Sequence, residues 1–249
     1  MHAAQEIRHA LSQVAELRKL STQHSALQMT CVRVKSLQAL RFAGTYADLL
    51  NSPMYGSSTR FFLQDLYSAR DFSERDAQFA RMAGTLERAL PESVVSTALT
   101  LAQLHQATEA LDFAMAQNWP SGESAPDAQA YVQAWRRVGQ RQQRLWQLTT
   151  VIEIGQSLGR FTRKPGLRML LKMMRQPAQL AGLAALHTFL ESGFEHFASM
   201  ARQGGKVAYF LETIQARETD WITRLFDDEA SRCSSQLQQT LALAPSPQT

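Results

Sequence analysis

Three side chains between residues 105 and 112 have the types and spacing that catalysis or metal binding would need. His105, Glu109 and Asp112 stand at positions i, i+4 and i+7. In a helix this spacing turns the imidazole and both carboxylates to one side, where a carboxylate could orient the ring or share a metal with it. The same residues could instead form a structural hydrogen-bond cluster beside a buried face. The sequence favours this second interpretation.

A helical oxidase with two metals would need Glu-x-x-His pairs on two helices and further carboxylates. The chain contains one such pair, Glu6 and His9, and Glu191, Glu195 and His196 could add ligands. The sequence has no second Glu-x-x-His, no glycine-rich phosphate loop and no zinc-ligand spacing. We therefore expect no metal and no cofactor. An enzymatic role remains the less favoured alternative.

A second group of charged residues lies among aromatic residues between positions 60 and 81. Two helices are expected to meet there at a tight corner. Ser73 is predicted to be the N-cap of the second helix, with Asp76 in its first turn, where a negative charge suits the exposed backbone amides. The charges are interpreted as a capping network at a structural corner.

In this corner Asp71 is expected to pair with Arg75, and Asp65 with Arg60. The alternative interpretation is a polar pocket with an aromatic floor, bounded by the corner and by the helix that carries His105. The candidate pocket residues are Arg60, Asp65, Tyr67, Asp71, Arg75, Asp76, His105, Glu109 and Asp112.

The corner also resembles a group of helical bacterial proteins that are known only as uncharacterised. The residues that carry the resemblance are Phe61-Phe62-Leu63, Asp65-Leu66-Tyr67, Asp71-Phe72, Arg75-Asp76 and Phe79. A later block is similar to the same group and comprises residues 190–197, Ile214 and Arg217-Glu218. The resemblance implies a helical fold and no established activity.

Composition supports a helical globular protein. Apolar residues make up 45% of the 249 residues, and 12 Gly and 8 Pro leave helix-favouring residues dominant. Cys31 and Cys233 are too few for a disulfide framework or a zinc site, and residues 1–8 lack the apolar core of a signal peptide. The longest apolar run, residues 177–190, is too short to cross a bilayer. We expect a cytoplasmic protein without transmembrane segments.

The apolar periodicity predicts one all-α domain over residues 1–243, with about eight to ten mostly antiparallel helices. The clearest position for a subdivision is 118–125, and residues 244–249 are expected to be a disordered tail. The predicted helices cover residues 3–42 (as one helix or as two joined end to end), 45–50, 91–117, 124–158, 166–175, 177–202, 206–226 and a final segment to 243.

Positive charge is concentrated between Arg136 and Arg175, where ten Lys or Arg residues accompany a single acid, Glu153. Within it, residues 166–175 alternate basic residues with Met and Leu, as an amphipathic helix does at an anionic lipid surface or an adaptable protein interface. The alternative is a short buried helix whose Lys and Arg side chains extend their charged groups into solvent. The candidate interaction residues are Arg168, Met169, Lys172, Met173 and Arg175. We find no signature of sequence-specific nucleic-acid binding.

The sequence thus favours a non-catalytic protein that binds an unidentified protein or small-molecule partner, with the basic segment as one candidate surface. The alternative is an enzyme, or a metal- or cofactor-binding bundle, that uses a polar cavity around His105, Glu109 and Asp112. A homo-oligomer is compatible with either function.

Overall fold

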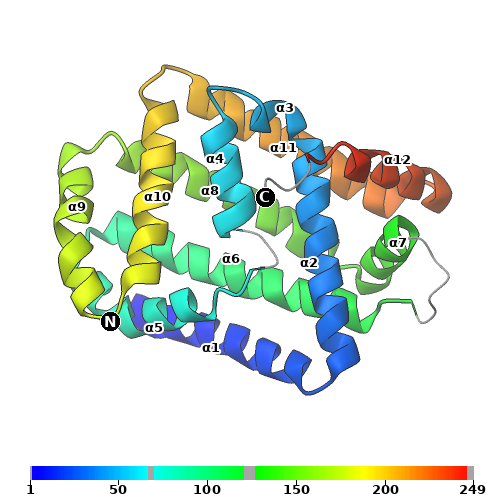
Figure 1. Cartoon of the computed structure of the whole chain (residues 1–249), viewed down its shortest axis with the longest axis horizontal. Helices are drawn as coiled ribbons and strands as arrows, with labels where there is room; N and C mark the ends of the chain where they lie inside the picture. Colours follow the sequence, from blue (N-terminus) through cyan, green and yellow to red (C-terminus); the bar gives the residue numbers. More distant parts are fainter. Residues whose placement is uncertain (1, 67–69, 121–126, 246–249) are drawn as a thin grey trace.

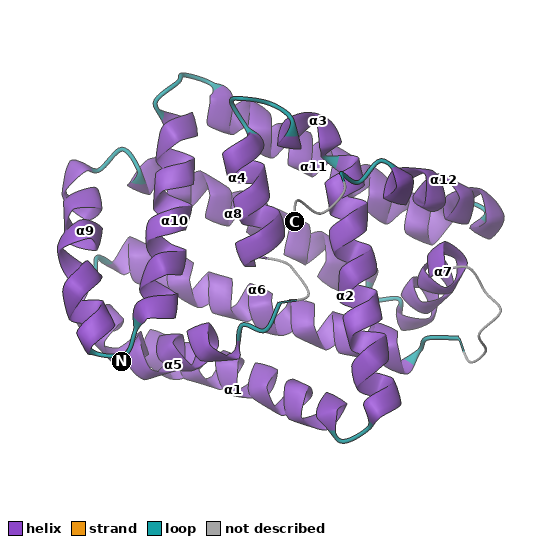
Figure 2. Cartoon of the chain, viewed as in Figure 1, coloured by secondary structure: helices purple, strands orange, loops and turns teal. Residues whose placement is uncertain are grey.

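The computed structural model describes residues 2–66, 70–120 and 127–245, and within these ranges all regular structure is helical (Figure 2). The predicted all-α fold is confirmed. The elements in chain order are α1 (Ala3–Thr22), α2 (Ser25–Thr45), α3 (Ala47–Leu50), α4 (Gly56–Phe61), the π-helical segment η1 (Phe62–Leu66), α5 (Ser73–Ala89), α6 (Glu92–Gln117), α7 (Asp127–Val138), α8 (Arg141–Phe161), α9 (Pro165–Leu180), α10 (Ala184–Ala201), α11 (Lys206–Asp227) and α12 (Ala230–Ala242).

Two of the predicted helix boundaries are wrong. The helix expected over 124–158 is interrupted at Gly139 and Gln140, whose φ angles of 65° and 60° lie in the left-handed region. Pro177, expected to begin a helix, lies inside α9, and the break falls at Gly182 with φ 67°. A left-handed residue ends a helix whatever the apolar pattern on either side, so periodicity alone hid both breaks. The described residues contain twelve α-helices, slightly more than the eight to ten that were expected.

The N-terminal region consists of two helices, which was one of the two alternatives left open. They are separated at Gln23 and His24, where His24 takes an extended conformation. Most of the proposed boundary at 118–125, most of the proposed tail at 244–249, and Tyr67 lie outside the described residues.

The helices form two crossing sets (Figure 1). Helices α2 and α10 run down the view and pass in front of α6 and α8, which run across it, and α4 runs down the view in front of α8. Helix α1 packs along both α5 and α6, α11 packs along α8, and α12 packs against α2 and α7. Helix α9 packs against α10 at one edge of the molecule.

Three apolar clusters hold these helices together. The first contains Trp135, Trp221 and Leu237 and joins α2, α6, α7, α11 and α12. The second contains Phe197 and Phe210 and joins α8, α10 and α11 with the segment that begins at Tyr46. The third joins α1, α5, α6 and α10. Across the described helices, none has the length and apolarity that crossing a bilayer requires.

Candidate ligand-binding cavity

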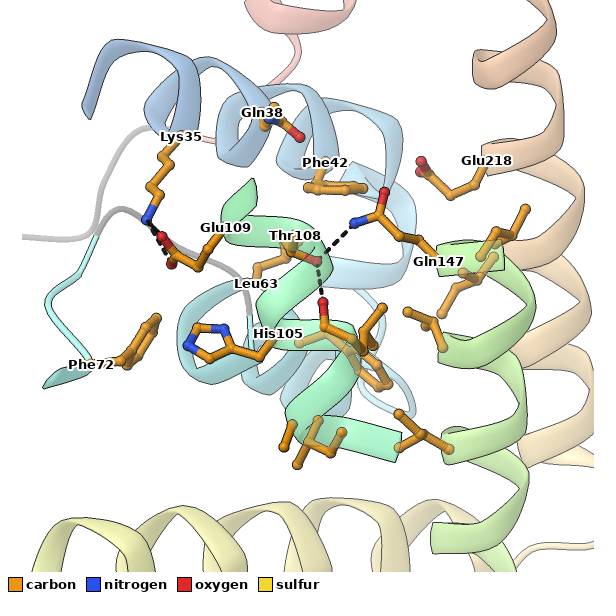
Figure 3. A pocket seen from close by; sticks show the side chains of 18 of the residues that line it. Lys35, Gln38, Phe42, Leu63, Phe72, His105, Thr108, Glu109, Gln147 and Glu218 are labelled. Atoms are coloured by element: carbon orange, nitrogen blue, oxygen red, sulfur yellow. Dashed lines mark hydrogen bonds and ion pairs between the residues drawn. The ribbon is translucent and has the colours of Figure 1, made fainter. Parts of the chain in front are cut away.

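A cavity of about 240 Å³ lies among helices from all three apolar clusters. Its wall is predominantly apolar and includes Phe62, Leu63, Phe79, Leu104, Val151 and Phe189. Charged and amide side chains from α2, α5, α6, α8 and α11 complete the wall (Figure 3). The corner and the helix that carries His105 therefore line the same cavity.

The corner supplies several of the aromatic residues of this wall. Phe61 ends α4 and is buried, while Phe62 and Leu63 follow in the π-helical segment η1 and line the cavity. The Phe62 ring lies 5.7 Å from the rings of both Phe197 and Phe210. A π-helical turn shifts the side-chain register of a helix and is frequent at functional sites. Here it places two consecutive apolar side chains on the cavity.

Asp76 is the centre of the charged network on the cavity wall. Its Oδ2 lies 2.8 Å from Nε2 of His105 and 2.9 Å from Nη2 of Arg18, and its Oδ1 accepts hydrogen bonds from Nε and Nη2 of Arg75. Burial by itself would raise the pKa of Asp76. The His105 hydrogen bond and the nearby positive charges outweigh burial and hold this pKa well below its usual value.

Glu109 lies next to this network and faces a different cation. Lys35 Nζ is 2.7 Å from both carboxylate oxygens of Glu109, and Figure 3 shows the two side chains facing each other. Nη2 of Arg18 is 3.6 Å from Glu109 and so connects it with Asp76. His105 and Glu109 therefore belong to one ion-pair network that spans α1, α2, α5 and α6.

Asp112 has a hydrogen-bond partner outside this network. Its side chain is 1% exposed and accepts a 2.7 Å hydrogen bond from Nε2 of Gln38. Burial raises its pKa, against the lowering effect of Lys35 and Arg144. Helical spacing correctly placed His105, Glu109 and Asp112 along one side of α6. Neighbouring helices nevertheless give Asp112 a different partner and the opposite pKa shift.

A second ion pair closes the opposite part of the wall. Arg41 donates to the two Glu218 oxygens at 3.1 and 2.8 Å, and the Tyr46 hydroxyl donates to Glu218 at 2.8 Å. Between the two ion-pair groups, Gln147 donates to the Thr108 hydroxyl at 2.8 Å (Figure 3). The charged side chains of this wall thus have protein partners.

Four of the nine candidate pocket residues line the cavity, namely Arg75, Asp76, His105 and Glu109. Asp112 is not part of the described lining. Tyr67 lies outside the described residues, and Arg60, Asp65 and Asp71 are not part of the described lining.

The interactions expected within the corner are replaced by others. Arg60 donates to the Leu50 carbonyl, and Arg75 contacts Asp76 and the Asp65 carbonyl. Ser73 is the first residue of α5 rather than its N-cap, and Asp71 accepts from the Ser73 backbone N–H. This hydrogen bond lowers the pKa of Asp71.

Helix α2 contributes polar residues to the wall that are not among the nine candidate pocket residues. Gln38 and Arg41 are buried, and both line the cavity with Lys35. A signal was present, because Gln38 and Arg41 share the helical face of Val34 and Leu37. Polar residues on a buried face need partners, so such positions are candidates for a site.

The described residues contain no group of three or more His, Cys, Asp or Glu side chains that could hold a metal ion together. Both cysteines are free thiols. Burial raises the pKa of Cys31 to about 11, and it also raises the pKa of Cys233. Thiols that stay protonated at neutral pH are poor nucleophiles.

The candidate interaction surface lies on α9, which packs against α10. Met169, Met173 and Leu180 are 65%, 69% and 91% exposed. Two of the basic residues face acids of α10, since Arg168 lies 3.5 Å from Glu195 and Arg175 pairs with Glu191. Lys172 is exposed on the same helix.

No curated protein and no solved structure matches this chain. The resemblance to an uncharacterised helical family is confirmed, because one family model spans both blocks of residues that carry it. That model, described as a domain of unknown function (DUF8198), matches residues 17–232, and the chain therefore belongs to this family.

Proposed function

We propose that this protein is a non-catalytic binding protein whose cavity takes a small, largely apolar molecule. The observation that carries the proposal is the cavity itself, with about 240 Å³ of space and a predominantly apolar wall. An apolar cavity of about 150 Å³ is large enough to bind benzene. This cavity is accordingly large enough for a molecule of about ten carbon atoms, such as naphthalene or a medium-length alkyl chain.

The partners of the charged residues support binding rather than catalysis. The two Asp76 oxygens contact Arg18, Arg75 and His105, and Glu109 faces Lys35. A carboxylate held by this many cations is a weak general base. The alternative was an enzyme or metal-binding bundle around His105, Glu109 and Asp112, and it would need Asp112 beside His105. Asp112 instead accepts from Gln38.

A cytoplasmic location is part of the proposal. Both cysteines are free, as is usual for thiols in a reducing compartment.

Titration calorimetry with naphthalene and with 1-decanol tests ligand binding. We expect one saturable site in the wild type. Val151 lines the cavity, so Val151→Trp should fill part of the space and remove binding, while Val151→Phe should weaken it. Val32→Trp is the matched control, since Val32 is exposed. No saturable binding to the folded wild type, or undiminished binding to folded Val151→Trp, would show that the cavity is not a ligand site.

We also propose that the exposed face of α9 contacts an anionic lipid surface. Exposed Met and Leu side chains beside basic residues are the features of a helix that lies in the head-group region. Lys172 and the exposed Arg163 and Lys164 at the start of the helix add further positive charge. Charge complementarity therefore favours phosphatidylserine over a neutral lipid.

Flotation with phosphatidylserine and phosphatidylcholine vesicles tests this surface. We expect binding to the anionic vesicles alone, weakened by salt. Binding should be lost when Arg168, Lys172 and Arg175 are changed to Glu, or when Met169 and Met173 are changed to Ser. Met29→Ser is the control, because Met29 is exposed on α2. Self-association that depends on the same methionines, without flotation, would instead identify a contact between copies of the chain.

A further inference from the structure

The amide oxygen of Gln38 is a hydrogen-bond acceptor on the cavity wall without a donor among the residues that the structure describes. Gln38 is 4% exposed and lines the cavity. Its Nε2 donates to Asp112 at 2.7 Å, which turns its Oε1 away from that carboxylate. Oε1 is not among the sealed side-chain atoms that lack a partner, so it retains accessible surface. Since the rest of Gln38 is buried, this surface opens onto the cavity.

Gln38 lies in the middle of the face of α2 that lines the cavity. Lys35, Gln38 and Phe42 all belong to the lining, and their positions i, i+3 and i+7 share one side of the helix. Figure 3 shows these three side chains along α2. The amide of Gln38 therefore has the Lys35–Glu109 ion pair on one side and the Phe42 ring on the other.

The donors nearest to Gln38 along this helix are directed to other acceptors. Lys35 Nζ donates to both oxygens of Glu109, at 2.7 Å each. Arg41 donates to Glu218 through Nη1 and Nη2. A buried amide oxygen is unfavourable without a donor, because it has given up contact with bulk water. A donor on a bound molecule would satisfy it.

The surroundings of this oxygen favour a neutral donor over a charged group. A ligand carboxylate would bring negative oxygens against the amide oxygen and has no proton to donate. A ligand ammonium would be buried near Lys35 and Arg41, which already neutralise Glu109 and Glu218. A hydroxyl group supplies one donor without a charge.

We infer that the ligand of the cavity is a neutral apolar alcohol or phenol. Its hydroxyl group donates a hydrogen bond to Oε1 of Gln38, and its hydrocarbon part lies against the apolar wall that includes Phe42, Phe62 and Leu63. This inference rests on the proposed function and adds to it the chemical class of the ligand.

Two ligands of nearly equal size separate the effect of the hydroxyl group from that of the rings. 2-Naphthol and 2-methylnaphthalene are titrated into the full-length protein at pH 7, where a phenol is protonated. We expect the dissociation constant of 2-naphthol to be about tenfold lower, because 2-methylnaphthalene leaves the Gln38 oxygen buried without a donor. 2-Methoxynaphthalene, whose oxygen can only accept, should bind no better than 2-methylnaphthalene. This ranking requires no variant.

Gln38→Met tests the position of the hydroxyl group, because methionine has a similar length and no amide oxygen. This variant should raise the dissociation constant of 2-naphthol about tenfold and change that of 2-methylnaphthalene much less. Gln28→Met, at an exposed position on the same helix, is the matched control and should change neither. Thermal unfolding of each variant verifies that it is folded.

The outcomes distinguish this inference from the proposed function. If 2-methylnaphthalene or 2-methoxynaphthalene binds as tightly as 2-naphthol, the cavity is a ligand site but its ligand is not a hydroxyl donor. A preference for 2-naphthol that folded Gln38→Met retains in full would overturn Gln38 as the acceptor. If none of the three ligands binds, the proposed function fails, and this inference fails with it.

Discussion

At the scale of single residues, Asp76 joins three helices, because its carboxylate contacts Arg18 of α1, Arg75 of α5 and His105 of α6. Asp76→Asn would leave Arg18 and Arg75 without their shared anion in a partly buried place. Removing one partner from a buried ion pair costs about 3–5 kcal/mol. We therefore expect the free energy of unfolding at pH 7 to fall by about 3 kcal/mol, measured by urea denaturation.

The pH dependence of this loss has a definite sign. The folded-state pKa of Asp76 is depressed, so its stabilisation is fully present above the unfolded value of about 3.9. This stabilisation is lost as the pH falls from the unfolded-state pKa toward the lower folded-state pKa of Asp76. The difference in the free energy of unfolding between Asp76→Asn and the wild type should therefore be largest at neutral pH and should decrease below about pH 4. A difference that does not change with pH would show that the charge of Asp76 is not what stabilises the fold.

Asp112 should behave in the opposite way. Its pKa is raised by burial, so its ionised form is disfavoured in the folded state, and that cost grows as the pH rises above the unfolded value of about 3.9. Asp112→Asn keeps an oxygen that can accept from Gln38. We expect it to leave the unfolding midpoint at pH 7 unchanged or to raise it. A loss of stability as large as that of Asp76→Asn would mean that Asp112 is ionised in the folded protein and that its charge stabilises Lys35 and Arg144.

At the scale of elements, the contact between α2 and α12 depends on a glycine. A Cβ added to Gly44 would lie 1.9 Å from the backbone oxygen of Thr240, so the two helices would have to separate. Gly44→Ala should therefore lower the free energy of unfolding by about 1–3 kcal/mol, the usual cost of overpacking.

The matched control for Gly44 is Gly166→Ala at the start of α9, where a Cβ would have no atom within 4 Å. Alanine favours helix over glycine by about 1 kcal/mol, so this variant should be neutral or slightly stabilising. Thermal melts of both variants by far-UV circular dichroism provide the comparison. Equal melting temperatures of the two variants would show that α2 and α12 are not in close contact.

At the scale of the whole molecule, we predict that the chain unfolds as one cooperative unit. All four tryptophans are in α7, α8, α11 or the segment after α6, at positions 119, 135, 146 and 221. Tryptophan fluorescence therefore reports on that half of the protein, whereas circular dichroism reports on every helix. The two unfolding curves should coincide if the protein is a single domain. Separate midpoints would indicate two units and support a division near residues 118–125.

The sequence by itself determined the helical class and the extents of several helices. Apolar periodicity and helix-favouring composition act along the chain, so the predicted 91–117 and 206–226 agree with α6 and α11 to within about a residue or two. Spacing along one helix likewise placed His105, Glu109 and Asp112 on the same side of α6. The breaks at Gly139 and Gly182 were missed, because a left-handed residue leaves no mark on the periodicity around it.

Only the tertiary structure decided which partner each polar residue meets. Asp76 and His105 are 29 residues apart, and Arg41 and Glu218 are 177 apart. No local pattern encodes such pairs, because each depends on which helix faces which. The cavity is even less visible in the sequence, since it is the space that the side chains of crossing helices leave unfilled. The periodicity and composition of the chain therefore determine the helices, and the packing between helices determines the candidate site.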